Sequence, residues 1–148
     1  MTSFFFDPTR TGLQHLHDLM SLDVQPGISA TLNMRLTHAE EGFVRFEATP
    51  DTRFYNLVGS AHGGYIATLL DSACGGAVHS RLAAGQTYIT LELKTSYHRP
   101  VTIETGPIRA EGRILSFGRR IAFTEAKLFG RSDKLLASAT STLLVSNL

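Results

Sequence analysis

One segment of the sequence combines residue types suited to acyl-transfer chemistry. It runs from Asn56 to Gly64, reads Asn-Leu-Val-Gly-Ser-Ala-His-Gly-Gly, and precedes an apolar stretch with helical spacing. If a helix begins at His62-Gly63-Gly64, its first N–H groups are unpaired and carry partial positive charge. Glycine lets a ligand approach the backbone, so this point suits a carbonyl oxygen that becomes negative during acyl transfer. The alternative is that Gly63 and Gly64 only allow tight packing where the loop joins the helix.

Asp71 is the second position that suggests chemistry. It lies in the run Leu69-Leu70-Asp71-Ser72-Ala73, where a carboxylate is disfavoured unless it is paired, exposed or functional. Because it is off the main apolar stripe of the predicted helix, an exposed position on the helix face is one interpretation. If Asp71 instead faces a cleft or a subunit interface, it is a candidate general base or nucleophile.

The spacing of His62 and Asp71 limits how they could act together. They are nine residues apart, which is about 13 Å along a helix axis and places the two side chains on roughly opposite sides. One helix cannot aim both groups at the same bond. If both serve one reaction, His62 and the Gly63 amide come from one chain and Asp71 from another. This predicts at least a dimer, with sites at the interface.

Hydrophobic periodicity predicts the elements that would position these residues. A long helix is predicted over 62–82, with an apolar stripe that starts at Ile66, and a shorter helix over 9–22, capped by Thr9 or Thr11. Alternating apolar residues predict strands over 28–36, 43–48, 88–97, 102–115, 119–129 and 135–145. In the strand over 88–97, one side is expected to carry Ile89, Leu91, Leu93, Thr95 and Tyr97.

This order of elements predicts an α+β fold in which an antiparallel sheet wraps around one long central helix. Gly75 and Gly76 each cost a helix about 1 kcal/mol relative to Ala, so we expect something to pack closely against them. The exposed sheet edges predict pairing between subunits. No internal repeat or linker is present, which favours a single domain over 1–148 with an N-terminal helical extension over about 1–25.

Composition excludes several classes of protein. The chain has 148 residues and a formal charge of +1, which argues against a nucleic-acid-coating protein. The single cysteine, Cys74, excludes an intrachain disulfide and a Cys-based zinc site, and it is compatible with a reducing compartment. The run Phe4–Phe6 is too short for a signal-peptide core or a membrane span. His15 and His17 cannot share a helix face, so we expect surface positions and no metal site. We expect a soluble, cytoplasmic protein with no nucleic-acid or membrane partner.

Six residues with their spacing form a specific pattern: Asn56, Gly59, His62, Gly63, Gly64 and Asp71. The pattern resembles the signature of hotdog-fold thioesterases of the phenylacetate-degradation type. The likeness covers about residues 28–146 and continues through Thr-Leu-Glu-Leu-Lys-Thr-Ser-Tyr-His-Arg-Pro at 90–100, where the family carries a strand ending in Tyr-x-x-Pro. The resemblance implies the hotdog fold and hydrolysis of acyl-CoA thioesters without a cofactor or metal. It also implies homodimers that pair into homotetramers.

The resemblance further implies a role for each motif residue. The Gly63 amide would bind the thioester carbonyl oxygen, while His62 and Asn56 would shape the loop and orient the thioester. Asp71 of the partner subunit would be the general base for water, or the nucleophile. Thr90 stands where related enzymes place a small hydroxyl residue that helps to hold the attacking water. The alternative for Thr90 is an ordinary strand-forming residue.

Substrate contacts are predicted from charge and position. Coenzyme A carries phosphates, so basic residues are expected at the entrance of the site. The residues assigned to substrate binding are Gly64, Tyr65, Arg119 and Arg120, with Arg81, Lys94 and Arg99 as further candidates for the phosphates and Phe54 and Tyr55 for the acyl pocket. Phenylacetyl-like, hydroxybenzoyl-like and medium-chain acyl groups all remain open. The alternative functions are a hotdog module that binds an acyl thioester without hydrolysing it and a hotdog dehydratase or hydratase, whose Asp-plus-His helix motifs are absent.

Overall fold

The long helix, α3, is the element around which the rest of the chain is arranged. In the computed structural model, which describes residues 6–148, α3 spans Gly63–His79 and its central residues Leu69, Leu70 and Ala73 are fully buried. The predicted helix over 62–82 is therefore confirmed, with an earlier end. Most of the run Phe4–Phe6 lies outside the described residues.

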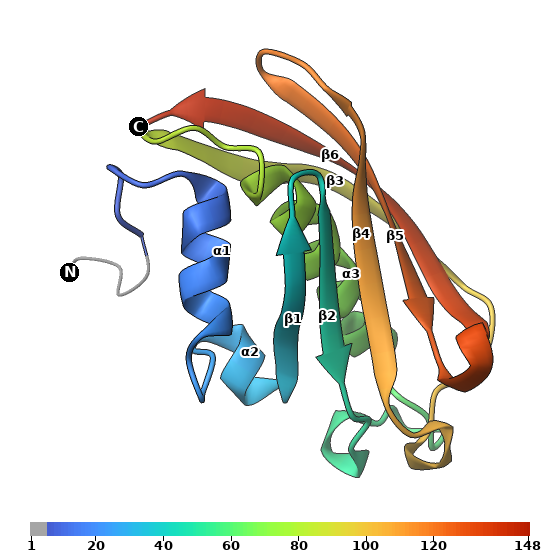
Figure 1. The fold of residues 1–148 in the computed structure, drawn as a ribbon. Coiled ribbons are helices and arrows are strands. Elements are labelled where there is room, and N and C mark those ends of the chain that lie inside the picture. The colour runs from blue at the N-terminus through green and yellow to red at the C-terminus, as the bar shows by residue number, and fades with distance from the viewer. Residues whose placement is uncertain (1–5) are drawn as a thin grey trace.

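A single antiparallel sheet curves around α3 (Figure 1). Its strands along the chain are β1 (Met34–Glu40), β2 (Phe43–Ala48), β3 (Gln86–Tyr97), β4 (Ile108–Phe117), β5 (Ile121–Phe129) and β6 (Leu135–Asn147). Their order in the sheet is β1-β2-β4-β5-β6-β3, so β3 lies at one edge and, among the described residues, pairs only with β6. This is the predicted α+β hotdog architecture.

The N-terminal part of the chain packs on the side of α3 next to β1. Helix α1 (Gly12–Met20) begins after Thr11, whose side chain forms a capping box with Gln14, and α1 contacts β1 and α3 (Figure 1). This confirms one of the two predicted caps.

The strand predicted over 28–36 is wrong in its first half. Ile28–Thr31 form a short helix, α2, and the extended backbone begins only at Met34. Gly27 and Asn33 both have positive φ angles, 64° and 51°, which interrupt an extended chain on either side of α2.

The two glycines inside α3 lie where other elements approach the helix closely. A Cβ at Gly76 would come within 2.9 Å of Val44 on β2, and one at Gly75 within 2.8 Å of the Tyr88 hydroxyl on β3. The expectation of close packing at these glycines is confirmed.

Strand β3 contains an irregularity in its pairing with β6, between Thr90 and Glu92. Before it, Thr90 points toward α3, and after it Leu93 packs on the core and Tyr97 reaches α3. The extra residue of a bulge reverses which side chains face inward. The expectation that Ile89 and Leu91 share a side with Leu93 is therefore wrong, and they are 60% and 55% exposed.

Candidate active site

The first turn of α3 leaves one backbone donor unused. His62 is the N-cap, and its Nδ1 accepts a hydrogen bond from the Gly64 N–H at 2.9 Å. The N–H groups of Tyr65 and Ile66 both bond to the His62 carbonyl oxygen. Within residues 6–148, no acceptor is bonded to the N–H of Gly63. Gly63 therefore presents a free donor at the positive end of a 17-residue helix.

The loop before α3 is closed by Asn56. Its Oδ1 accepts from the N–H groups of Val58 and Ser60, and its own N–H donates to the Ser60 carbonyl oxygen at 2.8 Å. Gly59 has a φ of 87°, which a residue with a side chain adopts only with strain. Asn56 thus holds the loop that leads to Gly63.

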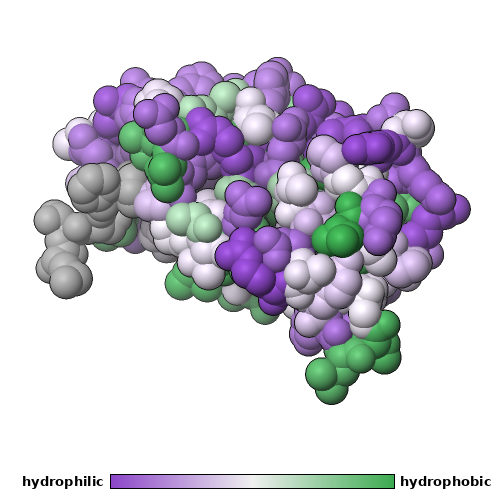
Figure 2. Space-filling model, turned by 90° about the horizontal axis from the view of Figure 1, so that it is seen from below, coloured by the Kyte–Doolittle hydropathy of each residue, from purple (hydrophilic) through white to green (hydrophobic). Residues whose placement is uncertain are grey.

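The same loop carries Leu57 and Val58, whose side chains are exposed. Seen from below the view of Figure 1, hydrophobic side chains stand out on a projection of an otherwise largely polar surface (Figure 2). The loop therefore offers apolar surface beside the free N–H of Gly63.

Tyr97 is a residue of this site that the sequence analysis did not single out. Its hydroxyl donates to the Gly63 carbonyl oxygen at 2.9 Å, which anchors the end of β3 to the start of α3. Gly63, Asn56 and Tyr97 line an open cavity of about 290 Å³, which continues along His98–Val101. The signal available in the sequence was the Tyr-x-x-Pro end of the predicted strand.

Asp71 is half-buried and faces β3. Its Oδ1 accepts a hydrogen bond from the Thr90 hydroxyl at 3.1 Å, and no ion pair within the described residues involves it. The structure therefore brings together the two residues for which the sequence proposed a shared role with water.

A single chain does not bring Asp71 to Gly63. They are eight residues apart on α3, which corresponds to about 12 Å along the helix axis. Gly63 lies with Asn56 and His62 at one end of the helix, and Asp71 lies with Thr90 near its middle.

The residues assigned to substrate contacts lie in different places. Gly64 and Tyr65 line a groove with His62, separate from the Gly63 cavity, and the Tyr65 ring stacks on Phe54 at 4.8 Å. Arg119 and Arg120 are exposed in the turn between β4 and β5 and lie outside that groove and the Gly63 cavity. Their role in substrate binding stays a prediction.

The expectation for His15 is wrong. Its Nδ1 lies 3.2 Å from Nε2 of His79 on α3, so His15 faces inward across the α1–α3 contact and is only half-exposed. The spacing of His15 and His17 shows only that they do not share a helix face, and the packing of α1 on α3 decides which of them faces inward. No helix within residues 6–148 has the length and apolar character needed to cross a bilayer.

Comparison with known proteins places this arrangement in a family. The sequence model of the thioesterase superfamily matches residues 58–137, which include Gly63, Asp71, Thr90 and Tyr97. The proofreading thioesterase EntH of Klebsiella pneumoniae is 33% identical over 91 residues, which are 62% of this chain and 65% of that protein.

Solved structures agree in fold over most of the chain. A phenylacetic acid degradation-related protein of Ralstonia eutropha JMP134 superimposes with a TM-score of 0.78 at 26% identity, covering 91% of this chain and 99% of the other. A thioesterase family protein of Silicibacter pomeroyi has the same fold, with a TM-score of 0.81 at 24% identity over 93% and 99% of the two chains. With a family match over more than half of its length, the chain belongs to the thioesterase superfamily.

Proposed function

We propose that the protein is an acyl-CoA thioesterase of the phenylacetate-degradation type, which hydrolyses aromatic or medium-chain acyl-CoA esters to the free acid and coenzyme A. The observation that carries the proposal is the free N–H of Gly63, a residue at the start of α3 that lines an open cavity. A donor fixed in this way stabilises the negative oxygen of a tetrahedral intermediate without reorganising during the reaction.

In the proposed reaction, the thioester carbonyl oxygen accepts a hydrogen bond from Gly63 of one subunit, and Asp71 comes from the partner subunit. As a general base, Asp71 takes a proton from water, whose oxygen attacks the carbonyl carbon. The C–S bond breaks and the leaving thiolate receives that proton. As a nucleophile, Asp71 would first attack the carbonyl carbon, break the C–S bond and release the coenzyme A thiolate, which forms a mixed anhydride. Water then hydrolyses the anhydride to the free acid and the Asp71 carboxylate, and the proton released goes to the thiolate. In either route Thr90 orients the carboxylate and the water, and the reaction needs no resident cofactor.

The edge position of β3 supports the proposed dimer. One side of β3 pairs with β6, while its other edge has no partner strand within the described residues. Pairing of two β3 edges about a twofold axis would continue the sheet and lay the two α3 helices antiparallel. This arrangement can bring the middle of one helix to the start of the other. The exposed Leu57 and Val58 offer apolar surface for the further pairing of dimers into a tetramer.

A cleft with three cations supports coenzyme A as the thiol. Arg99, Arg131 and Lys134 line a space of about 460 Å³ that shares Arg99 and Pro100 with the Gly63 cavity. None of the three cations forms an ion pair within residues 6–148, although Glu104 also lines the cleft. Arginine and lysine are the usual ligands of phosphate groups. A pantetheine arm lying in the Gly63 cavity would place the phosphates of coenzyme A in this cleft.

We also propose a cytoplasmic location, because the lone Cys74 fits a reducing compartment.

Release of free thiol from phenylacetyl-CoA, 4-hydroxybenzoyl-CoA and octanoyl-CoA, followed with a dithiol reagent, tests the proposal. We expect hydrolysis of at least one ester, and we expect Asp71→Asn to lower kcat by about 1,000-fold or more while KM changes little. Asp71→Asn activity within a few-fold of the unchanged protein would overturn the assignment. Tight binding of an ester in calorimetry without any thiol release would instead identify the non-catalytic binding module.

A further inference from the structure

The turn between β5 and β6, over residues 130–134, has an unusual backbone (Figure 1). Ser132 and Asp133 both lie in the left-handed region, with φ angles of 56° and 57°, although neither is a glycine. Two such residues in succession are costly, and they persist only where the surrounding structure holds them. Backbone strain of this kind is concentrated at sites that bind ligands, where it fixes side chains in one geometry.

An ion pair with the outer face of the sheet holds this turn. Arg109 on β4 donates to the Asp133 carboxylate, with Nη2 and Oδ1 2.6 Å apart. The Asp133 side chain is 82% exposed, and an isolated pair at such a place contributes little. Arg109 is held independently of this pair, because its Nε donates to Glu111 at 3.1 Å and its guanidinium lies over the Phe129 ring, 4.8 Å from the centroid. Formation of the pair therefore orders only the Asp133 side chain, which lowers its entropic cost.

The contacts of Arg109 extend across the sheet. Glu111 is only 15% exposed, and its Oε1 also accepts from Nε and Nη2 of Arg45 on β2, at 3.1 and 3.0 Å. The four charged side chains form a chain of alternating sign from β2 to the turn: Arg45, Glu111, Arg109 and Asp133. Because Glu111 fixes both arginines, the turn is tied to two strands of the sheet and not to a freely moving side chain.

The same turn carries two cations of the cleft described above. Arg131 and Lys134 line that cleft, and the two left-handed residues lie between them in the chain, so the strained backbone sets the directions of both side chains. The Lys134 N–H donates to the Arg131 carbonyl oxygen at 3.3 Å, which closes the turn. The Arg131 guanidinium lies against Gly106, where an added Cβ would come within 2.7 Å of it. The structure thus leaves room for this guanidinium at the wall of the cleft.

We propose that the Arg109–Asp133 pair is a positioning contact for phosphate recognition. It holds the strained turn so that Arg131 and Lys134 point together into the cleft that takes the phosphates of coenzyme A. Neither Arg109 nor Asp133 touches the substrate. The inference rests on the proposed function, which assigns coenzyme A to this cleft, and it adds two residues outside the cleft that determine the affinity. Without the pair the turn relaxes, and binding must order the two cations itself, which weakens it.

Asp133→Asn tests the proposal because two effects of this change have opposite signs. Asn tolerates the left-handed region as Asp does, so the variant removes the ion pair and keeps the backbone preference. Loss of a negative charge near the cleft would by itself strengthen the binding of an anionic ligand. Loss of the positioning contact weakens it. For the acyl-CoA ester that the protein hydrolyses fastest, we expect KM to rise by about three- to fivefold, and we expect no rise for the N-acetylcysteamine thioester of the same acid, which lacks the phosphates.

Glu104→Gln is the matched control for charge. Glu104 lines the same cleft and forms no ion pair within residues 6–148, so the loss of its charge acts through the electrostatic field alone. We expect this variant to lower KM for acyl-CoA, in the direction opposite to Asp133→Asn. An unchanged or lowered KM in Asp133→Asn would overturn the inference.

A second background shows whether Asp133 acts through the turn. In Arg131→Ala/Lys134→Ala the cations that the turn positions are absent, so the addition of Asp133→Asn should raise KM no further. A further rise of three- to fivefold in this background would locate the effect elsewhere and contradict the proposal.

Binding of free coenzyme A separates this inference from the proposed function, because it needs no hydrolysis. In calorimetry we expect the Kd of coenzyme A to be about three- to fivefold higher for Asp133→Asn than for the unchanged protein. If the unchanged protein hydrolyses no acyl-CoA ester, the proposed function fails, while the two Kd values still decide the role of Asp133. Equal Kd values, or no binding of coenzyme A to the unchanged protein, would refute that role.

Discussion

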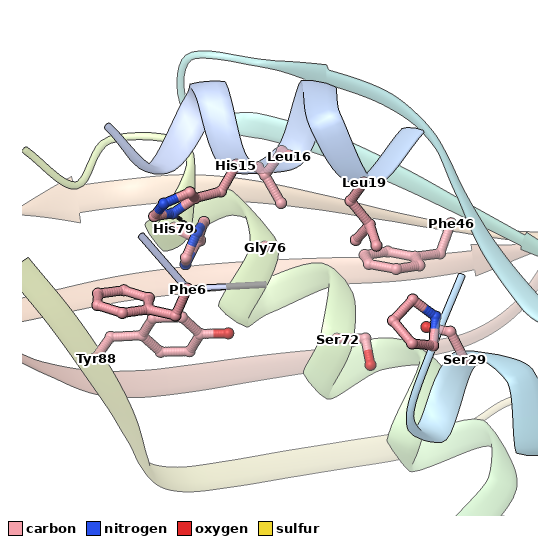
Figure 3. A pocket seen from close by; sticks show the side chains of 11 residues that line it. Phe6, His15, Leu16, Leu19, Ser29, Phe46, Ser72, Gly76, His79 and Tyr88 are labelled. Atoms are coloured by element: carbon pink, nitrogen blue, oxygen red, sulfur yellow. Dashed lines mark hydrogen bonds between the residues drawn. The ribbon is translucent and has the colours of Figure 1, made fainter. Parts of the chain in front are cut away.

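Two regions along α3 differ in how far their polar groups are hydrogen-bonded within the chain. At the start of α3, the side chains of His62 and Asn56 accept hydrogen bonds and Tyr97 donates one, which fixes the loop and the first turn. Within residues 6–148, the N–H of Gly63 is the one backbone donor of the first turn without an acceptor. In the cavity of about 320 Å³ between α1 and α3, the hydroxyl groups of Ser72 and Tyr88 have no partner in residues 6–148 (Figure 3). In the first region, a fixed backbone donor can stabilise one negative charge without rearrangement when the substrate binds. The proposed reaction uses the first region and not the second, so we expect changes at the first to alter the rate with every substrate.

After Asp71→Asn, the largest effect is expected from removing the free donor of Gly63. Gly63→Pro deletes this N–H at the first position of a helix, where proline is well tolerated, and His62 already has a ψ of 138°, which suits a residue before proline. We expect kcat to fall by about 100- to 1,000-fold with all esters. Gly63→Ala is the matched control because it keeps the N–H and brings a Cβ equally close to Tyr97, at 3.2 Å. Equal losses in the two variants would show that the Tyr97 contact, and not the N–H, matters.

A smaller effect on the rate is expected at Thr90. Thr90→Val keeps the shape and the strand preference of the side chain but removes the hydroxyl that donates to Asp71. Hydrogen bonds to a charged group are worth about 1.5–3 kcal/mol, so we expect kcat to fall by about 10- to 100-fold. Thr90→Ser restores the hydroxyl and should recover most of this loss in steady-state assays. A Thr90→Val protein as active as Thr90→Ser would make Thr90 a strand residue only.

The cationic cleft predicts a change in KM alone. Replacing Arg131 and Lys134 together by Ala should raise KM for acyl-CoA by about 5- to 10-fold and leave kcat unchanged, since exposed charge pairs are individually weak. The N-acetylcysteamine thioester of the same acid, which lacks the phosphates, should show no change. The same measurement on Arg119→Ala/Arg120→Ala decides whether that pair, predicted from the sequence, contributes from the partner subunit.

The smallest effect is expected in stability, at the end of the cavity. Because burial lowers the pKa of His79 to about 4 from an ordinary 6.5, the unfolded chain takes up a proton below pH 6.5 that the folded chain does not. Stability is therefore lost as the pH falls from about 6.5 toward 4. Between pH 7 and 5.5 this loss amounts to about 1 kcal/mol. Urea unfolding at both pH values should show it in the unchanged protein and not in His79→Gln. An identical pH dependence in both proteins would refute it.

The sequence predicted the elements and the motif better than the cavity. Periodicity predicted α3 and the strands that follow it. The spacing of His62, Gly63 and Asp71 predicted that one chain cannot bring all three residues to the same bond. Alternation alone could not predict α2, because the positive φ angles at Gly27 and Asn33 are set by the chain around them. The pairing of Asp71 with Thr90 was indicated only by resemblance.

Contacts across the fold were the part that the sequence could not provide. His15 and His79 are 64 residues apart and meet because α1 packs on α3, so no local pattern shows them as neighbours. Alternation in the predicted strand over 88–97 places Tyr88 on the side opposite Ile89, as an ordinary strand residue. Its place beside Gly75 depends on how closely β3 approaches a helix that lacks side chains at that point.

The irregularity in β3 explains how one strand can serve two distant parts of α3. Residue 90 has an even number and residue 97 an odd one, so an unbroken strand would turn one of these side chains toward solvent. The additional residue near position 91 lets Thr90 meet the carboxylate and Tyr97 meet the first turn of the same helix. A chain one residue shorter at this point would keep either the Thr90–Asp71 contact or the Tyr97–Gly63 contact, but not both. The length of this strand is therefore a requirement of the site.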